Sequence, residues 1–392
     1  MTAAGLGGGP PGRPGTLPVP APGDLGTVHV VLPGDIDDPA APSGGNRYDR
    51  RICAGLAGAG WTVREHGLPG AWPHPGPNAV RRLTTLLAAL PDGATVLVDG
   101  LVAVGVPEPL TAHAARLRTV VLAHMVFGDA DAALAGAEHA VLTAARAVVT
   151  TSRWCRERLI SRYGLPPATV HAAPPGADPA AVAPGTPVGT RLLCVAAVAA
   201  HKGHDTLVAA LTTLTGLDWD CTCVGPLDRD PAFTARLRAD AAPLAGRLHL
   251  TGPRTGPDLD AAYAAADLLV LASRGESYGM VITEALARGV PVLATDVQGL
   301  PEALGRAPDG TRPGLLVPPG DPAALAAALR RWLTDPGLRT TLRRAALGRR
   351  ATLTGWDRTT AAISGVLASL PAEPALPGGR TVYNSTDEPR KE

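Results

Sequence analysis

Short apolar segments alternate with longer amphipathic ones along most of this chain. Runs such as 28–32 and 268–272 are rich in Val and Leu, which is typical of strands buried on both faces of a parallel sheet. Segments such as 80–90 and 323–333 place apolar residues three and four positions apart, as amphipathic helices do. Further strands are predicted at 63–66, 95–98, 119–123, 147–151, 192–198, 219–224, 248–250 and 290–294, and further helices at 47–59, 133–144, 205–214, 338–353 and 356–370. This alternation predicts an α/β fold.

The length of the chain, 392 residues, suits two domains with separate cores. Residues 170–190 are dense in Pro, Gly and Ala, which interrupt secondary structure, so we place the domain boundary in this segment. The predicted units are a disordered start (1–26), a first domain (27–185), a second domain (186–353), a terminal helix (354–370) and a disordered tail (371–392).

Composition narrows the class of protein. Hydrophobic residues make up 45% of the chain but aromatic residues only 3%, so the cores must be built from Ala, Val and Leu. A net charge of +1 argues against a general nucleic-acid binder. The five cysteines are odd in number and lie mainly in apolar runs, which favours free buried thiols. No apolar run is long enough to span a bilayer and the start lacks an apolar signal core, so a cytoplasmic protein is expected.

The stretch that follows the strand at 268–272 carries the most candidate chemistry. A polar loop leads into a segment with helical spacing and then into the next strand. Such a loop lies at the carboxyl end of a strand, where open parallel sheets bind ligands. The backbone of Ser277, Tyr278, Gly279 and Met280 opens the helix, and free N–H groups at a helix start suit a phosphate.

Two carboxylates, Glu276 and Glu284, stand eight positions apart, one in this loop and one on the helix. Glu284 can accept hydrogen bonds from neighbouring hydroxyls, and Glu276 can reach a group attached to the phosphate. A sugar nucleotide presents both kinds of group. On spacing alone, solvated charges on an ordinary helix are the simpler interpretation.

The amino-acid sequence of this segment is more specific than the spacing of its two carboxylates. ESYGMVITEALARGVPVLATDVQGLPE, residues 276–302, resembles the signature of the retaining family-4 glycosyltransferases, which belong to the glycosyl transferases group 1 and have the GT-B fold. The resemblance covers about residues 27–370 and implies two Rossmann-like domains that face each other across a cleft. It implies that Glu276 holds the transferred sugar and Glu284 the ribose. It also implies retention of the anomeric configuration and a reaction without a metal ion.

Near the start of the first domain, Gly44 and Gly45 precede the predicted helix. Paired glycines let backbone approach a ligand closely, although an ordinary turn is the alternative. In the resembled family this loop borders the donor phosphate, so both glycines are assigned to donor binding. The acceptor-side candidates are Asn46, Tyr48, Asp49 and Asp99, the last at the end of the strand at 95–98.

His124 follows the strand at 119–123. A lone histidine after a strand is more often structural than catalytic. The resembled family carries a histidine at this strand end, where it meets the transferred sugar from the opposite domain. His124 therefore joins Glu276 as a catalytic candidate.

In the second domain, Lys202 and Gly203 place a cation and flexible backbone where a diphosphate would lie. The family usually has an arginine a few residues earlier, at the position that aligns with Ala197, so the usual pair of cations is incomplete. Arg254 and Arg274 are the nearest candidates to replace it. The resemblance also sets the backbone near Arg254 against the nucleobase, which makes it a donor-binding candidate.

No metal site is expected from the sequence. His201 and His204 are three positions apart, but no third ligand lies near them. Acidic pairs such as Asp37-Asp38 lie in loops away from the predicted site.

We therefore expect a glycosyltransferase that moves a sugar from a nucleotide diphosphate donor, with a UDP-sugar as the expected donor, to a small-molecule or glycan acceptor. No separate cofactor and no nucleic-acid partner are expected. A sugar-nucleotide epimerase or glycoside phosphorylase of the same fold is one alternative. A catalytically silent nucleotide-sugar or glycan-binding protein is a second alternative, because the sequence departs from the family at two positions. Ala197 stands where the family usually has an arginine, and Gln298 stands where it often has a glycine.

Overall fold

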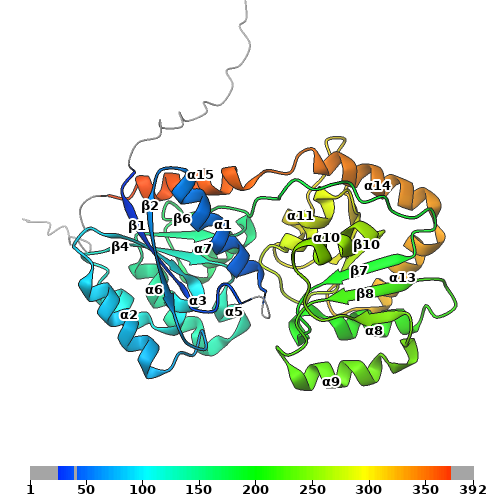
Figure 1. The fold of residues 1–392 in the computed structure, drawn as a ribbon, viewed down its shortest axis with the longest axis horizontal. Helices are drawn as coiled ribbons and strands as arrows, with labels where there is room; N and C mark the ends of the chain where they lie inside the picture. The colour runs from blue at the N-terminus through cyan, green and yellow to red at the C-terminus, as the bar shows by residue number, and fades with distance from the viewer. Residues whose placement is uncertain (1–24, 39–41, 372–392) are drawn as a thin grey trace, which may run out of the picture.

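The computed structural model describes residues 25–38 and 42–371, and the account below concerns those residues. They form two lobes, each built around a six-stranded sheet with helices on both faces (Figure 1). All strand pairings are parallel. The predicted α/β fold with two Rossmann-like domains is therefore confirmed. Except for residues 25, 26 and 371, the two segments predicted to be disordered lie outside the described residues.

The first sheet has the order β2-β1-β3-β4-β5-β6. Its strands are β1 (Thr27–Pro33), β2 (Thr62–Leu68), β3 (Thr95–Asp99), β4 (Arg118–Ala123), β5 (Ala147–Thr150) and β6 (Val170–Ala172). Its helices are α1 (Gly44–Gly58), α2 (Pro77–Ala89), α3 (Gly100–Gly105), α4 (Pro107–Ala112), α5 (Phe127–Ala130), α6 (Ala135–Ala144) and α7 (Arg153–Tyr163), with a 3-10 turn, η1 (Ala132–Leu134). Alternate residues of β1 enter different cores: Val28 and Val30 pack on one face of the sheet, and Val31 packs on the other.

The second sheet has the order β12-β11-β10-β7-β8-β9. Its strands are β7 (Arg191–Val195), β8 (Asp220–Val224), β9 (Leu248–Leu250), β10 (Leu268–Leu271), β11 (Val292–Thr295) and β12 (Gly314–Val317). Its helices are α8 (His204–Thr212), α9 (Pro231–Asp240), α10 (Gly256–Ala265), α11 (Met280–Ala287), α12 (Leu300–Leu304), α13 (Pro322–Thr334) and α14 (Pro336–Arg350), with 3-10 turns η2 (Ala200–Lys202) and η3 (Ala242–Leu244). Its two faces are covered by separate cores of mainly Leu, Val and Ala.

The last helix, α15 (Trp356–Ala368), lies against the first lobe although it follows the second in sequence (Figure 1). Ile363 and Leu367 share a buried cluster with Val28 of β1 and Leu56 of α1. The ring of Trp356 also meets the ring of Tyr48 edge to face, with centroids 5.7 Å apart. This packing anchors the end of the described chain to the face of the first sheet that α1 covers.

Several elements differ from the sequence predictions. The first helix begins at Gly44 rather than near Arg47, because the hydroxyl of Ser43 accepts a hydrogen bond of 3.0 Å from the N–H of Asn46 and caps it there. The strands β6 and β12, the helices α7, α9 and α10, and the short helices α3, α4, α5 and α12 were not predicted. The three residues of β6 belong to the segment that we interpreted as a linker, and they pair with β5 because Val170 is buried in the first core.

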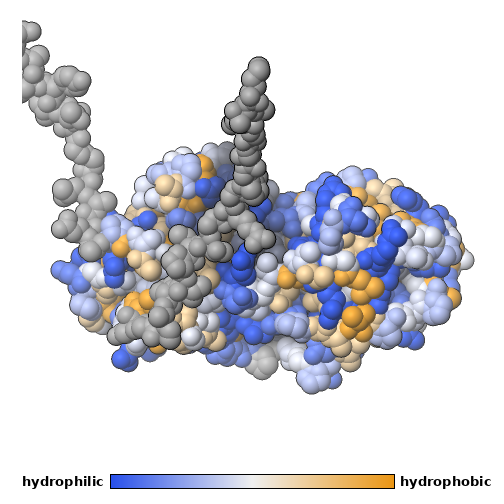
Figure 2. Space-filling view, turned by 90° about the horizontal axis from the view of Figure 1, so that it is seen from above, coloured by the Kyte–Doolittle hydropathy of each residue, from blue (hydrophilic) through white to orange (hydrophobic). Residues whose placement is uncertain are grey.

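The surface of the described residues offers little hydrophobic area. Its exposed large hydrophobic side chains are Val182, Val188 and Leu347. Figure 2 shows hydrophobic and hydrophilic residues interspersed over the face seen from above. None of the described helices is both long and apolar enough to cross a membrane.

Candidate active site

The start of α1 in the first domain faces the start of α11 in the second. A Cβ atom at Gly44 would lie 3.7 Å from the sulfur of Met280, which is the first residue of α11. A Cβ atom at Gly45 would lie 3.6 Å from Cδ2 of His124. The glycine pair therefore belongs to the first turn of α1, not to the loop that we predicted, and it brings His124 and the start of α11 to the same place.

The imidazole of His124 contacts two buried carboxylates. It follows β4, and its Nε2 lies 2.8 Å from Oδ1 of Asp49 on α1 and 3.2 Å from Oδ2 of Asp99 at the end of β3. Asp99 also caps α3, since its Oδ1 accepts a hydrogen bond of 2.6 Å from the N–H of Leu101. The imidazole is thus fixed from two elements while its side chain keeps 14% of its surface exposed.

The two carboxylates determine the charge of this histidine. Burial alone would lower the pKa of His124, but Asp49 and Asp99 outweigh burial and raise the pKa to about 10. Burial raises the pKa of Asp49 to about 7 although His124 opposes the shift. Burial also acts to raise the pKa of Asp99, but the hydrogen bond with His124 prevails and the pKa is lowered. At neutral pH the ring is therefore an imidazolium held by the two carboxylates.

The structure places three of the acceptor-side candidates in the interior, where their side chains were not expected. Tyr48, Asp49 and Asp99 are 1%, 1% and 3% exposed, so their side chains lie in the interior behind His124 and do not line a surface. The hydroxyl of Tyr48 donates to the carbonyl of Ala173 at 2.7 Å. The cause is the helical period of α1, which turns Tyr48 and Asp49 towards the sheet. Asn46, in the first turn, stays half-buried and remains a candidate.

On the other side of the α11 start, Lys202 forms an ion pair with Glu276. Lys202 ends the turn η2, and Gly203 follows it with a left-handed φ of 69°. A Cβ atom at Gly203 would lie 1.9 Å from the carbonyl oxygen of Ala272, so no other residue fits at this close approach. The structure thus brings together the cation and the carboxylate that sequence reasoning had placed separately.

The loop that carries Glu276 is tied to the loop before α12. The N–H of Glu276 donates to Oε1 of Gln298 at 2.6 Å, and the N–H of Gly299 donates to the carbonyl of Glu276 at 3.0 Å. Gln298 has a φ of 48°, a left-handed conformation that is uncommon outside glycine. The residue that stands in place of a family glycine therefore holds the loop by its side chain, a role that the sequence did not show.

The start of α11 keeps the features expected of an anion site. No described side chain caps this helix, and of its first three amides the N–H of Ile282 donates to the carbonyl of Gly279 at 2.9 Å. The amides of Met280 and Val281 precede the first intrahelical bond of an α-helix. Ser277 is half-buried beside it, whereas the side chain of Tyr278 is buried in the core of the second domain. Tyr278 can therefore reach a donor only through its backbone.

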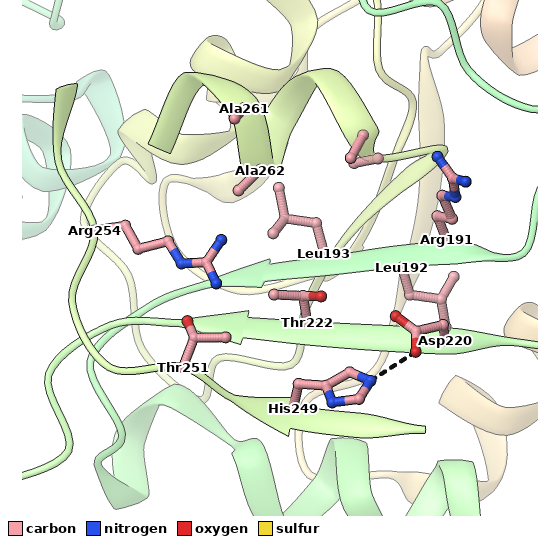
Figure 3. A pocket seen from close by; sticks show the side chains of 12 residues that line it. Arg191, Leu192, Leu193, Asp220, Thr222, His249, Thr251, Arg254, Ala261 and Ala262 are labelled. Atoms are coloured by element: carbon pink, nitrogen blue, oxygen red, sulfur yellow. Dashed lines mark hydrogen bonds and ion pairs between the residues drawn. The ribbon is translucent and has the colours of Figure 1, made fainter. Parts of the chain in front are cut away.

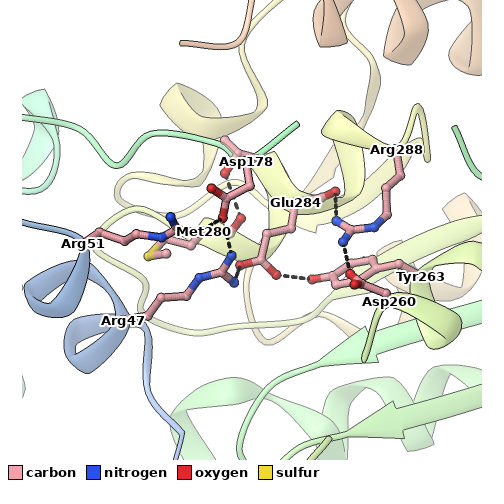
Figure 4. A network of polar contacts seen from close by, with 9 residues as sticks. Arg47, Arg51, Asp178, Asp260, Tyr263, Met280, Glu284 and Arg288 are labelled. Carbon is pink, nitrogen blue, oxygen red and sulfur yellow. Dashed lines mark hydrogen bonds and ion pairs between the residues drawn. The ribbon is translucent and has the colours of Figure 1, made fainter. Parts of the chain in front are cut away.

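Glu284, one turn along α11, takes part in a network that joins the domains (Figure 4). Its Oε2 accepts a hydrogen bond of 2.8 Å from the hydroxyl of Tyr263, and its Oε1 accepts one from Nη1 of Arg47 on α1. Arg47 and Arg51 both form ion pairs with Asp178, at 2.9 Å and 2.5 Å. Arg47 was missed by sequence reasoning, although it stands between two residues that were named.

The two arginines proposed to replace the cation at Ala197 have different surroundings. Arg274 forms a bidentate ion pair with Asp205, at 2.9 Å and 2.7 Å, which holds its guanidinium on α8. Arg254 lines a groove of about 510 Å³ between α10 and the strands β8 and β9 (Figure 3). Its side chain points over Thr222. The hypothesis that Arg274 binds the diphosphate is therefore not supported by its position.

Two sets of described side chains could hold a cation, since their ligand atoms lie within 4.8 Å of one another. They are Asp49, Asp99 and His124, and Cys194, His204 and Cys223. In the first set, Nε2 of His124 already bonds both carboxylates. In the second, Nδ1 of His204 has no hydrogen-bond partner among the described residues, whereas a metal-bound histidine usually donates its other ring N–H. A reaction without metal stays a prediction.

Solved structures share this two-domain fold. Sucrose-phosphate synthase from Thermosynechococcus elongatus matches with a TM-score of 0.71 at 22% identity, over 87% of this chain and 98% of that chain. Anabaena Alr3699/HepE in complex with UDP and glucose matches with a TM-score of 0.70 at 18% identity, over 87% and 99%. The fold is GT-B, as the resemblance implied.

Sequence comparison gives the family. Residues 189–335 match the model for glycosyl transferases group 1. The D-inositol 3-phosphate glycosyltransferase of Nocardiopsis dassonvillei is 33% identical over 295 residues, which are 70% of this chain and 67% of the relative. That of Salinispora arenicola is 35% identical over 67% of this chain and 63% of the relative. The chain belongs to the glycosyl transferases group 1, and it spans 56% to 67% of the length of the curated relatives it matches.

Proposed function

We propose that this protein transfers a sugar from a nucleoside diphosphate donor to an acceptor, with retention at the anomeric carbon and without a metal ion. The observation that carries the proposal is the meeting of His124 and the α1 start with the start of α11, which Glu276 precedes and Glu284 follows. These groups come from both domains, so a donor bound at α11 lies against the residues of the opposite domain.

Each group has a role in this proposal. The first amides of α11 and the ammonium of Lys202 neutralise the leaving diphosphate, where negative charge grows as the glycosidic bond breaks. Glu276 accepts hydrogen bonds from the sugar and Glu284 from the ribose. The His124 imidazolium donates to the sugar from the first domain, and Asp49 and Asp99 keep it charged. UDP-sugars are the first donors to test, because three solved structures of Anabaena Alr3699/HepE with this fold contain UDP or UDP-glucose.

The location and partners follow the same proposal. We infer a cytoplasmic enzyme that meets a nucleotide-sugar donor and a small-molecule or glycan acceptor. D-inositol 3-phosphate is one acceptor to test, because it appears in the names of the curated relatives.

The test has two steps. Thermal unfolding is measured with UDP-, GDP-, ADP- and TDP-sugars, and a ligand at 100 times its Kd should stabilise the fold by about 2.7 kcal/mol. Release of nucleoside diphosphate is then measured with and without acceptors. Release that requires an acceptor supports transfer, whereas conversion of the donor without release indicates epimerisation. If the protein binds a donor but shows neither reaction with any acceptor of a panel, the alternative of a catalytically silent binding protein is supported. The anomeric configuration of the product, determined by NMR, tests retention.

A further inference from the structure

Arg47 contacts the carboxylate to which the proposed function assigns the ribose. Its Nη1 donates to Oε1 of Glu284 and its Nη2 donates to Oδ2 of Asp178 at 2.9 Å (Figure 4). The hydroxyl of Tyr263 takes the other oxygen of Glu284 at 2.8 Å. Both oxygens of Glu284 are therefore occupied by protein groups, and one of these groups comes from the opposite domain.

We propose that Arg47 is the second cation of the diphosphate site and replaces, from the first domain, the arginine missing at position 197. The proposal rests on the proposed function, since it concerns the same donor site. A diphosphate carries more negative charge than one lysine and one helix start offset. Arginine suits this role because its planar guanidinium can hold two oxygens at once.

The distance that the guanidinium must cover is short. Gly44 of α1 lies against Met280 of α11, and Arg47 and Glu284 lie three and four residues further along their helices. The guanidinium is therefore about one helical turn, roughly 5 Å, from the first amides of α11. When ribose hydroxyls bind Glu284, they compete with Nη1. Asp178 keeps hold of Nη2, so the side chain can pivot on this contact towards the phosphates.

The two arginines considered earlier for this role have other surroundings. Arg274 is held by Asp205 and Arg254 lies in the groove beside β8 and β9. Lys202, the first cation of the site, is paired with Glu276 in the same way that Arg47 is paired with Glu284. Arg47 is 39% exposed at its side chain and reaches α11 from across the domain interface, so it can follow a ligand that binds there.

The same contact has a second reading that predicts the opposite result. If Arg47 only blocks Glu284 in the free protein, its removal frees the carboxylate for ribose and tightens nucleotide binding. If Arg47 moves to the phosphates, its removal weakens binding of any ligand that carries them. The sign of the change in affinity, and its dependence on phosphate, therefore separates the two.

The experiment measures dissociation constants by calorimetry for UDP and for uridine, or for the diphosphate and nucleoside of whichever base the donor panel selects. We expect Arg47→Ala to weaken UDP by about 10-fold or more, as for a lost charge-assisted contact, and to leave uridine within a few-fold. Arg51→Ala is the matched control. Arg51 lies on the same helix and bonds the same Asp178 but does not contact Glu284, so UDP affinity should stay within a few-fold.

Tighter UDP binding, unchanged UDP binding, or an equal loss for UDP and uridine in Arg47→Ala would each overturn the proposal. Arg47→Met, which keeps the apolar stem, repeats the measurement if the alanine variant unfolds. Ala197→Arg should change UDP affinity by no more than a few-fold, and a 10-fold gain would show that the site lacks a cation. If the wild-type protein binds no nucleoside diphosphate, the proposed function itself fails, whereas wild-type binding with a silent Arg47→Ala refutes only the role of Arg47.

Discussion

Oδ1 of Asp49 and Nε2 of His124 lie 2.8 Å apart, although the two residues belong to a helix and to the end of a strand. Asp49 is 1% exposed, so this contact is shielded from solvent. The same helix places Gly45 against the imidazole, where a Cβ atom would be 3.6 Å from the ring. The ring is thus held in one orientation by α1, which also carries Arg47 to the domain interface.

His124→Ala should fold and lose turnover by roughly 100-fold or more, the scale expected when a positioned polar group is lost from a transition state. Its side chain is 14% exposed and borders the α11 start through Gly44 and Gly45. Steady-state kinetics with circular dichroism as a folding check would measure this. His74→Ala, at an exposed histidine outside the site, should be silent. Near-normal turnover in His124→Ala would remove the residue from the mechanism.

The free energy of unfolding should decrease as pH rises from about 6.5 to about 10. The pKa of His124 is raised from 6.5 to about 10 in the folded protein, so the unfolded chain releases this proton first. The stabilisation is complete below pH 6.5 and is lost as pH approaches the folded pKa. Urea unfolding at pH 7 and at pH 9.5 measures this change. Between these two pH values the free energy of unfolding of the wild-type protein should fall by at least about 1 kcal/mol more than that of His124→Gln, since one pKa unit is worth 1.36 kcal/mol. An equal decrease in the free energy of unfolding of both proteins would contradict the assignment of His124 as an imidazolium.

Gln298 should tolerate glycine better than alanine. At a φ of 48°, Gln298→Gly relieves left-handed strain of about 1 kcal/mol while it loses the hydrogen bond to the N–H of Glu276, which is worth about as much. Gln298→Ala keeps the strain and loses the bond, so it should destabilise by about 1–2 kcal/mol. Both variants release one tether of the Glu276 loop and should lower turnover. Denaturation midpoints in the opposite order would disprove the strain argument.

How far the sequence predicted the site depends on the range of each contact. The unit from β10 to β11 was predicted correctly because a buried strand, a helix start and the next strand are all local signals. The pairing of Arg47 with Glu284 joins residues 237 positions apart, and no periodicity in the sequence reports such a contact. The burial of Asp49 could have been anticipated, because it lies three positions before Ile52 on the buried face of α1.

For the acceptor side, the roles that the family resemblance implied differ from what the burial of the side chains allows. Position after the glycine pair suggested that Tyr48 and Asp49 face an acceptor, but both lie on the face of α1 that packs against the sheet, together with Ile52, Cys53 and Leu56. Positions on strands were predicted more reliably, as the placement of His124 directly after β4 shows.

Activity should survive excess EDTA. In the proposed mechanism the diphosphate is neutralised by helix amides, by Lys202 and by Arg47, so no divalent cation is required. Turnover is measured after dialysis against EDTA and again with added Mg²⁺ or Mn²⁺. Loss of turnover that either ion restores would show that a metal, held by residues such as Asp49, Asp99 and His124, takes part.

Glu276→Gln should separate sugar recognition from diphosphate binding. In the free protein the Glu276 carboxylate forms an ion pair with Lys202, whose side chain is only 20% exposed. The amide of the variant can still accept from a sugar hydroxyl but no longer carries charge, so turnover should fall by roughly 100-fold or more. Lys202 loses its counter-ion and becomes freer to meet a diphosphate, so affinity for UDP should stay the same or increase. Kinetics and calorimetry on Glu276→Gln, with the exposed Glu157→Gln as control, test both parts. If UDP affinity falls as far as turnover does, Glu276 acts by holding Lys202 in place and not by holding the sugar.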